Sequence, residues 1–247
     1  MVLPELVAHR GYTRRYPENT LVAIEGAIRA GARFVEVDVQ LSRDRVPVLF
    51  HDATLDRVCG APGAIHDHTV DQLKRLRASE FNRFGYRYAN VHIATLAELA
   101  ALLAQHREVT AFIELKQESL TRFGIDEVLA RVRTDLGPLG PQIVLISYAL
   151  DALLAARRAG WPILGAVLER WGQRRRSIVR EIAPQYLFCD VDDLPRFGRI
   201  AARAARVVVF EVAEVDVALR LAQRGVGFIE TYAVGELRQA FDLLAAA

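Results

Sequence analysis

Residues 34–52 read FVEVDVQLSRDRVPVLFHD, and this stretch decides how the rest of the chain is interpreted. Two apolar runs, 34–41 and 47–51, are separated by only the residues 42–46. A parallel crossover needs about a dozen residues or more. The second run must therefore fold back on the first as an antiparallel hairpin.

The hairpin brings acidic residues and a histidine together. Side chains alternate along a strand, so Glu36, Asp38 and Gln40 share one face, and the valines between them share the other. A fold-back centred near Asp44 then places His51 close to the two carboxylates. Charges near buried strands cost solvation free energy unless they bind something.

Short apolar runs alternate with longer amphipathic segments along the whole chain. Strands that alternate with helices pair in parallel through right-handed crossovers, with helices covering the sheet. Without the hairpin run eight strands remain, the number that closes a TIM barrel. We therefore predict one α/β domain over 1–247, a (β/α)8 barrel with a β-hairpin extension after its second strand. The expected strands are 6–9, 33–41, 110–115, 143–148, 162–168, 186–191, 207–212 and 227–231.

The segment from about 52 to 95 departs from this alternation. It carries Gly60, Pro62 and Gly63, followed by histidines and several aromatic residues. We expect an inserted excursion above the C-terminal mouth of the barrel, serving as a lid or a substrate wall.

The composition excludes several classes of protein. The 247 residues are 52% hydrophobic, and the 32 basic residues are interleaved with 30 acidic ones, which argues against a nucleic-acid surface. Of the basic residues only Lys74 and Lys116 are lysine. No leader pattern and no run of 18 apolar residues occurs, and two cysteines are too few for a disulfide framework. We expect a cytoplasmic protein with a small-molecule substrate and no membrane insertion, as a monomer or homodimer.

Polar residues collect at the ends of the expected barrel strands. His9, Glu36, Asp38 and Glu114 all fall at such ends, where TIM-barrel active sites lie. Three converging carboxylates repel one another unless a cation joins them. Oxygen ligands without cysteine suit Mg²⁺ or Ca²⁺ better than Zn²⁺. We therefore predict one divalent ion at this site.

Two histidines and two cations complete the candidate site. Histidine titrates near neutrality, so one of His9 and His51 can remove a proton while the other donates one. Arg10 and Lys116 can neutralise an anion in the same mouth.

These residues resemble the glycerophosphodiester phosphodiesterase family, of the cytoplasmic bacterial type. Five fragments match in the family's order and approximate spacing, and together they are strongly specific. They are His9-Arg10-Gly11, Pro17-Glu18-Asn19-Thr20, Glu36-Val37-Asp38-Val39, His51-Asp52 and Glu114-Leu115-Lys116.

The resemblance implies a TIM barrel that hydrolyses glycerophosphodiesters to glycerol 3-phosphate and an alcohol. It further implies roles for the matched residues: Glu36, Asp38 and Glu114 as metal ligands, His9 and His51 as the acid–base pair, and Arg10 and Lys116 as phosphate ligands.

Two further residues are candidates for substrate contact. Glu18 precedes Asn19 and Thr20, either of which can cap a helix over 21–30, and we place this structural role slightly ahead of contact with substrate. Tyr148 follows an apolar run and is a candidate for the pocket wall.

The chain departs from the family pattern at three places. The family usually has Asp-Gly in the hairpin, where this chain has Asp44-Arg45, so we expect a turn without glycine-dependent geometry. The segments 209–212 and 228–232 also differ from the family. Glu211 and Glu230 in these segments face the site by position, and they either favour a cationic head group or act as ordinary capping and salt-bridging acids.

Two alternative functions stay open. One is lysophospholipase D action on a lysolipid, with an apolar entrance formed by Phe81, Phe84, Tyr86 and Tyr88. The other is a barrel that binds phosphorylated ligands with weakened or no turnover.

Overall fold

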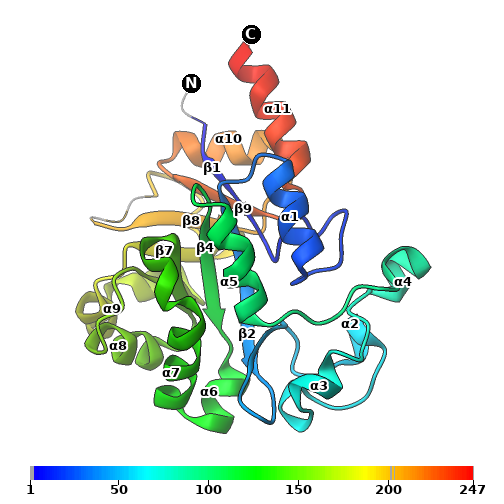
Figure 1. The fold of residues 1–247 in the computed structure, drawn as a ribbon. Coiled ribbons are helices and arrows are strands. Elements are labelled where there is room, and N and C mark those ends of the chain that lie inside the picture. Colours follow the sequence, from blue (N-terminus) through cyan, green and yellow to red (C-terminus); the bar gives the residue numbers. More distant parts are fainter. Residues whose placement is uncertain (1–2, 201, 203, 247) are drawn as a thin grey trace.

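The strands close into a barrel in the computed structural model, which describes residues 3–200, 202 and 204–246 (Figure 1). Within these residues nine strands form one sheet in the order β1-β9-β8-β7-β6-β5-β4-β2-β3, and a further β1–β2 pairing closes it. Eight strands pair in parallel, and the ninth, β3, is antiparallel to β2. The strands are β1 (Glu5–Ala8), β2 (Phe34–Leu41), β3 (Pro47–Leu49), β4 (Thr110–Leu115), β5 (Ile143–Ser147), β6 (Leu164–Leu168), β7 (Tyr186–Asp190), β8 (Arg206–Phe210) and β9 (Phe228–Thr231).

The predicted TIM barrel is confirmed, and every expected strand agrees with an observed one to within two residues. Helices follow the strands and cover the outside of the barrel (Figure 1). Thr20 begins the first of them, since its side chain accepts a hydrogen bond from the Ala23 N–H at 3.3 Å. The covering helices are α1 (Leu21–Arg29), α5 (Leu96–Gln105), α6 (Gln117–Phe123), α7 (Ile125–Leu136), α8 (Leu150–Arg158), α9 (Ser177–Ile182), α10 (Val215–Gln223) and α11 (Val234–Ala246).

Side chains alternate in direction along the strands, which gives one apolar layer between the strands and the helices and a second one inside the barrel. Val35, Val37 and Val39 of β2 pack outward in the large cluster shared with the helices. The inward residues form a smaller cluster inside the barrel, in which aromatic rings predominate at one level. This inner cluster contains Val7, Phe112, Val144, Ile146, Val167, Tyr186, Phe188, Val208 and Phe228, with Phe34 and Phe210 packed against it.

Three strands carry the same inward-facing pair, a phenylalanine followed two residues later by a glutamate. The pairs are Phe34 and Glu36 on β2, Phe112 and Glu114 on β4, and Phe228 and Glu230 on β9. The ring of Phe34 lies 6.1 Å from that of Phe112 and 5.0 Å from that of Phe228, measured between centroids. The rings therefore fill the barrel, and the glutamates stand one level nearer the C-terminal mouth.

The hairpin formed by β2 and β3 has the predicted antiparallel pairing, with Val39 opposite Leu49 and Leu41 opposite Pro47. Its turn corrects one expectation. Arg45 has a φ of 63°, so the turn keeps a left-handed residue even though no glycine is present. The backbone is held instead by Ser42, whose hydroxyl accepts from the Val46 N–H at 2.9 Å and donates to Asp44 at 2.7 Å.

The excursion between β3 and α5 has a small core of its own, built on Val48 and Phe50 of the hairpin. It consists of short helical segments that extend to one side of the barrel, seen in cyan in Figure 1. They are α2 (Asp56–Cys59), η1 (Ile65–Asp67), α3 (Val70–Leu73), α4 (Phe81–Phe84) and η2 (Gly85–Tyr88).

Replacement of Arg45 by glycine is expected to stabilise the protein. Glycine adopts a positive φ without the steric cost that other residues carry there, and the exposed Arg45–Glu127 ion pair at 3.4 Å contributes little. We expect Arg45→Gly to raise the free energy of unfolding by about 0.5–1 kcal/mol in chemical denaturation. Arg43→Gly, in the same loop but outside the left-handed region, should lower it, and equal effects of the two variants would contradict this account.

Candidate active site

Polar side chains at the C-terminal ends of the strands line one cavity of about 110 Å³. Every predicted site residue except Glu18 lies on its wall, together with Glu230. Its apolar lining comes from Ile146, Val167, Phe188 and Phe210. The polar lining consists of His9, Arg10, Glu36, Asp38, His51, Glu114, Lys116, Tyr148 and Glu230.

Three of the carboxylates form a compact cluster. Asp38 on β2 lies opposite Glu114 on β4 in the sheet, and an oxygen from each lies within 4.8 Å of one from Glu36. Burial and the neighbouring Asp38 raise the pKa of Glu36 well above its ordinary value. Glu36 Oε1 is buried and meets no hydrogen-bond partner among the described residues. This all-oxygen donor set fits a hard divalent ion.

Two cations stand against the same cluster. The Nζ of Lys116 lies 3.3 Å from Asp38 and 3.1 Å from Glu114, and the Nε of Arg10 lies 3.2 Å from Asp38. Burial alone raises the pKa of Asp38, but Arg10 and Lys116 outweigh it and hold that pKa well below the usual range. Asp38 is thus an ionised carboxylate in a buried setting.

The hairpin places His51 at the cavity wall, and the Gln40 side chain holds the backbone around His51. The Gln40 side-chain amide donates to the carbonyl oxygens of Phe50, His51 and Asp52, at 3.1, 3.2 and 2.7 Å. The His51 Nδ1 is hydrogen-bonded to the Asp52 carboxylate at 2.7 Å. Burial lowers the pKa of His51, and the attraction of Asp38 does not reverse this.

Arg57 connects this histidine to the candidate phosphate ligand Arg10. Its guanidinium, on α2 of the excursion, donates twice to Glu18 at 2.7 and 2.8 Å and twice to Asp52 at 2.7 and 2.8 Å. Glu18 in turn accepts from Arg10 at 3.0 Å. The Arg57 hydrogen bonds outweigh the effect of burial and lower the pKa of Asp52 to about 2.

Sequence reasoning missed Arg57, although it lies only six residues after His51. Glu18 lies outside the cavity wall, where it binds Arg10 and Arg57, and Thr20 rather than Glu18 caps the helix that follows. The excursion therefore holds the two sides of the cavity in place.

His9 lies just after β1, with carboxylates on several sides. Its Nδ1 is hydrogen-bonded to Glu211, and its Nε2 lies 4.0 Å from Glu36. Burial acts to lower the pKa of His9, but Glu230 and Glu211 together raise it above its ordinary value. Glu230 is only 3% exposed, and burial is the main cause that raises its pKa to about 8.

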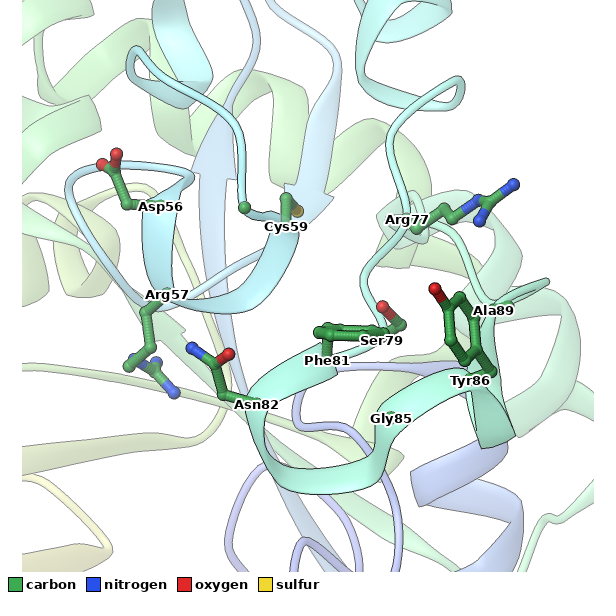
Figure 2. Close-up of a pocket in the computed structure, with 11 residues that line it drawn as sticks. Asp56, Arg57, Cys59, Arg77, Ser79, Phe81, Asn82, Gly85, Tyr86 and Ala89 are labelled. Carbon is green, nitrogen blue, oxygen red and sulfur yellow. The ribbon is translucent and has the colours of Figure 1, made fainter.

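A second hollow of about 310 Å³ lies in the excursion, beside Arg57 (Figure 2). Phe81 and Tyr86 line it and are largely exposed, with their rings 5.0 Å apart in an edge-on contact. Tyr88, also expected at an apolar entrance, is instead buried, and its hydroxyl donates to the Arg15 carbonyl at 2.6 Å. The exposed aromatic surface is therefore smaller than the sequence suggested.

Two histidines, clustered carboxylates and two cations meet at the mouth of this TIM barrel, a set of groups suited to the chemistry of phosphate-ester hydrolysis. The family model described as the glycerophosphoryl diester phosphodiesterase family matches residues 9–159. The chain belongs to this family, as its sequence motifs predict.

Individual relatives agree with this assignment. The chain is 36% identical over 126 residues to a glycerophosphodiester phosphodiesterase of Caldanaerobacter subterraneus subsp. tengcongensis, covering 51% of each chain. It is 30% identical over 164 residues to bovine (Bos taurus) glycerophosphodiester phosphodiesterase 1, covering 66% of this chain and 48% of that one. The chain thus spans about half the length of these curated relatives.

A solved structure matches the whole fold. A phosphodiesterase of Oleispira antarctica, in complex with the product sn-glycerol-3-phosphate, shares 27% identity and a TM-score of 0.85, covering 97% of both chains. Across the part of the chain that the structure describes, no helix is long and apolar enough to cross a membrane.

Loss of Arg57 is expected to impair turnover without unfolding the protein. Arg57→Ala frees both Asp52 and Glu18, so His51 and Arg10 lose their fixed positions, and kcat/KM should fall about 100-fold. Arg57→Lys keeps the charge but cannot bind both carboxylates bidentately, so it should recover little of this loss. Steady-state release of glycerol 3-phosphate measures the effect.

Arg77→Ala is the matched control, because Arg77 also lies on the excursion and lines the hollow of Figure 2. It should retain nearly full activity. Equal losses in the Arg57 and Arg77 variants would show that the excursion tolerates no charge removal and that Arg57 has no special role.

Proposed function

We propose that this protein hydrolyses glycerophosphodiesters to glycerol 3-phosphate and an alcohol. The observation that carries the proposal is the meeting of His9, His51 and three carboxylates in one cavity of a chain that belongs to this family. The product bound to the Oleispira antarctica protein supports the same substrate class.

Glu36, Asp38 and Glu114 are proposed to hold one divalent ion, Mg²⁺ or Ca²⁺. The buried, unpartnered oxygen of Glu36 and the absence of sulfur from these three residues fit such an ion. When bound, the ion supplies Lewis-acid polarisation of a phosphoryl oxygen.

Arg10 and Lys116 are proposed to bind the phosphate. Both already lie at the carboxylate cluster, so the phosphodiester is attracted to the point where the metal ligands converge. Glu18 keeps Arg10 in this position, and Tyr148, which is 45% exposed, forms part of the wall at the outer edge of the cavity.

His9 and His51 are proposed to move the protons. One histidine takes a proton from the attacking oxygen, and the other gives a proton to the oxygen of the leaving alcohol. Each has its Nδ1 on a carboxylate, which leaves Nε2 as the nitrogen available for proton transfer. The apolar floor under these groups limits the access of water from below.

Removal of either histidine or of the metal should abolish most of the activity. We expect His9→Ala and His51→Ala each to lower kcat by a factor of about 10²–10⁴, and a chelator to abolish turnover until Mg²⁺ or Ca²⁺ is restored. Glycerol 3-phosphate release from glycerophosphodiesters with several head groups is the assay.

His106→Ala, at the end of α5 and outside the cavity, is the control and should be unaffected. Metal-loaded wild-type protein that binds glycerophosphodiesters without turnover would instead support the ligand-binding alternative.

The exposed rings of Phe81 and Tyr86 are the observation that favours action on a lysolipid as a second candidate function. Because Tyr88 is buried and the cavity is small, we expect kcat/KM for a deacylated glycerophosphodiester to exceed that for the matching lysophospholipid below its micellar concentration. A preference for the acylated compound that disappears in a Phe81→Ser, Tyr86→Ser double variant would reverse this assignment.

A further inference from the structure

His9 and its carboxylate partner come from opposite ends of the chain. Glu211 follows β8 directly, 202 residues after His9, and its Oε2 is hydrogen-bonded to the His9 Nδ1. Both residues lie beside β9, where β1 and β8 each pair with that strand. The pairing of β9 with both β1 and β8 is therefore what brings the two residues together.

The Glu211 carboxylate is fixed at both oxygens. Its Oε1 accepts a hydrogen bond from the backbone N–H of Tyr232 at 2.8 Å, while Oε2 contacts His9. The backbone of His9 is tied to the same strand end, since its N–H donates to the Thr231 carbonyl at 3.1 Å. The imidazole and the carboxylate are thus held on one rigid frame.

The two cavity histidines share this arrangement. His51 has Asp52 on its Nδ1 at 2.7 Å, and His9 has Glu211 on its Nδ1. A carboxylate on Nδ1 fixes the ring orientation and selects the tautomer with the proton on Nδ1, so that Nε2 is free for proton transfer. Asp52 is the next residue after His51 in the sequence, whereas Glu211 is far from His9 in the sequence and approaches it only in the folded chain.

We infer that Glu211 is a positioning residue for His9, so that each of the two histidines that line the cavity is held by a carboxylate on its Nδ1. This inference rests on the proposed function. It assigns to Glu211 a contact with His9 in place of a contact with substrate. Glu230, which is buried beside His9 with its Oε1 unpartnered among the described residues, is not part of this pair.

The Tyr232 N–H makes Glu211→Gln an informative variant. This N–H needs an acceptor, so the glutamine oxygen should turn toward it and leave the NH₂ group facing His9 Nδ1. The Nδ1 must then accept, which puts the ring proton on Nε2, the wrong nitrogen for proton transfer. Glu211→Ala removes the partner without imposing a tautomer.

We expect kcat to fall about 100-fold or more in Glu211→Gln and by a smaller factor in Glu211→Ala, with KM changed less than about threefold in both. A carboxylate that only stabilises the fold predicts the opposite order, because glutamine preserves the shape of glutamate. Glu214→Gln removes an exposed charge from the same connection and should leave kcat unchanged.

¹⁵N spectra of histidine-labelled, Mg²⁺-loaded protein provide a readout that does not depend on turnover. His9 should carry its proton on Nδ1 in the wild type and on Nε2 in Glu211→Gln, with the His51 resonances little changed. A wild-type Nδ1 without a proton, or a Glu211→Gln kcat within twofold of the wild type, would overturn the inference. Inactive wild-type protein with the expected spectra would instead remove the proposed function and leave the His9–Glu211 pair intact.

Discussion

Repulsion among buried carboxylates is the constraint on which the cavity depends. Glu36, Asp38, Glu114 and Glu230 point into the barrel from three strands, where the dielectric is low and every unpaired negative charge is costly. They remain there because the strands that carry them are fixed by the aromatic layer one level below. The barrel thus supplies the rigidity that keeps these like charges together.

The same constraint explains the groups around the cluster. Arg10 and Lys116 lie against Asp38, and Arg10 is itself held by Glu18. Arg57 then joins Glu18 to Asp52, so a single guanidinium from the excursion holds the partners of both Arg10 and His51. A bidentate arginine suits this position because its planar fork satisfies two carboxylates at once.

Local pattern predicted most of the fold. The short separation of the two apolar runs predicted the hairpin, and alternation along β2 correctly placed Glu36 and Asp38 on the inner face. The left-handed Arg45 was missed because Ser42 and Asp44 stabilise a turn that propensity assigns to glycine. These interactions depend on side-chain geometry that composition does not encode.

Site contacts between residues close in sequence were easier to predict than contacts between residues far apart in sequence. Asp52 adjoins His51 in sequence, whereas Arg57 required knowledge of how α2 packs. Position at a strand end placed Glu230 at the site, and the Phe-x-Glu pair shared by three strands is a second sequence signal for it. Position also placed Glu211 at the site, but no sequence signal paired it with His9, because that contact spans 202 residues and depends on the pairing of β9 with both β1 and β8.

Burial and the charges of the side chains around the cavity together set the raised pKa values of Glu230 and His9. Five carboxylates, with Glu211 included, face the two permanent cations Arg10 and Lys116, and the proposed divalent ion would reduce this excess of negative charge without removing it. Protons supply part of the remainder, since the pKa of Glu230 is raised to about 8 and that of His9 is raised as well. The proposed divalent ion would add positive charge beside these groups and favour their deprotonated forms, so its uptake would release protons. The carboxylates therefore raise the pKa of His9 as well as offering oxygen ligands to a cation.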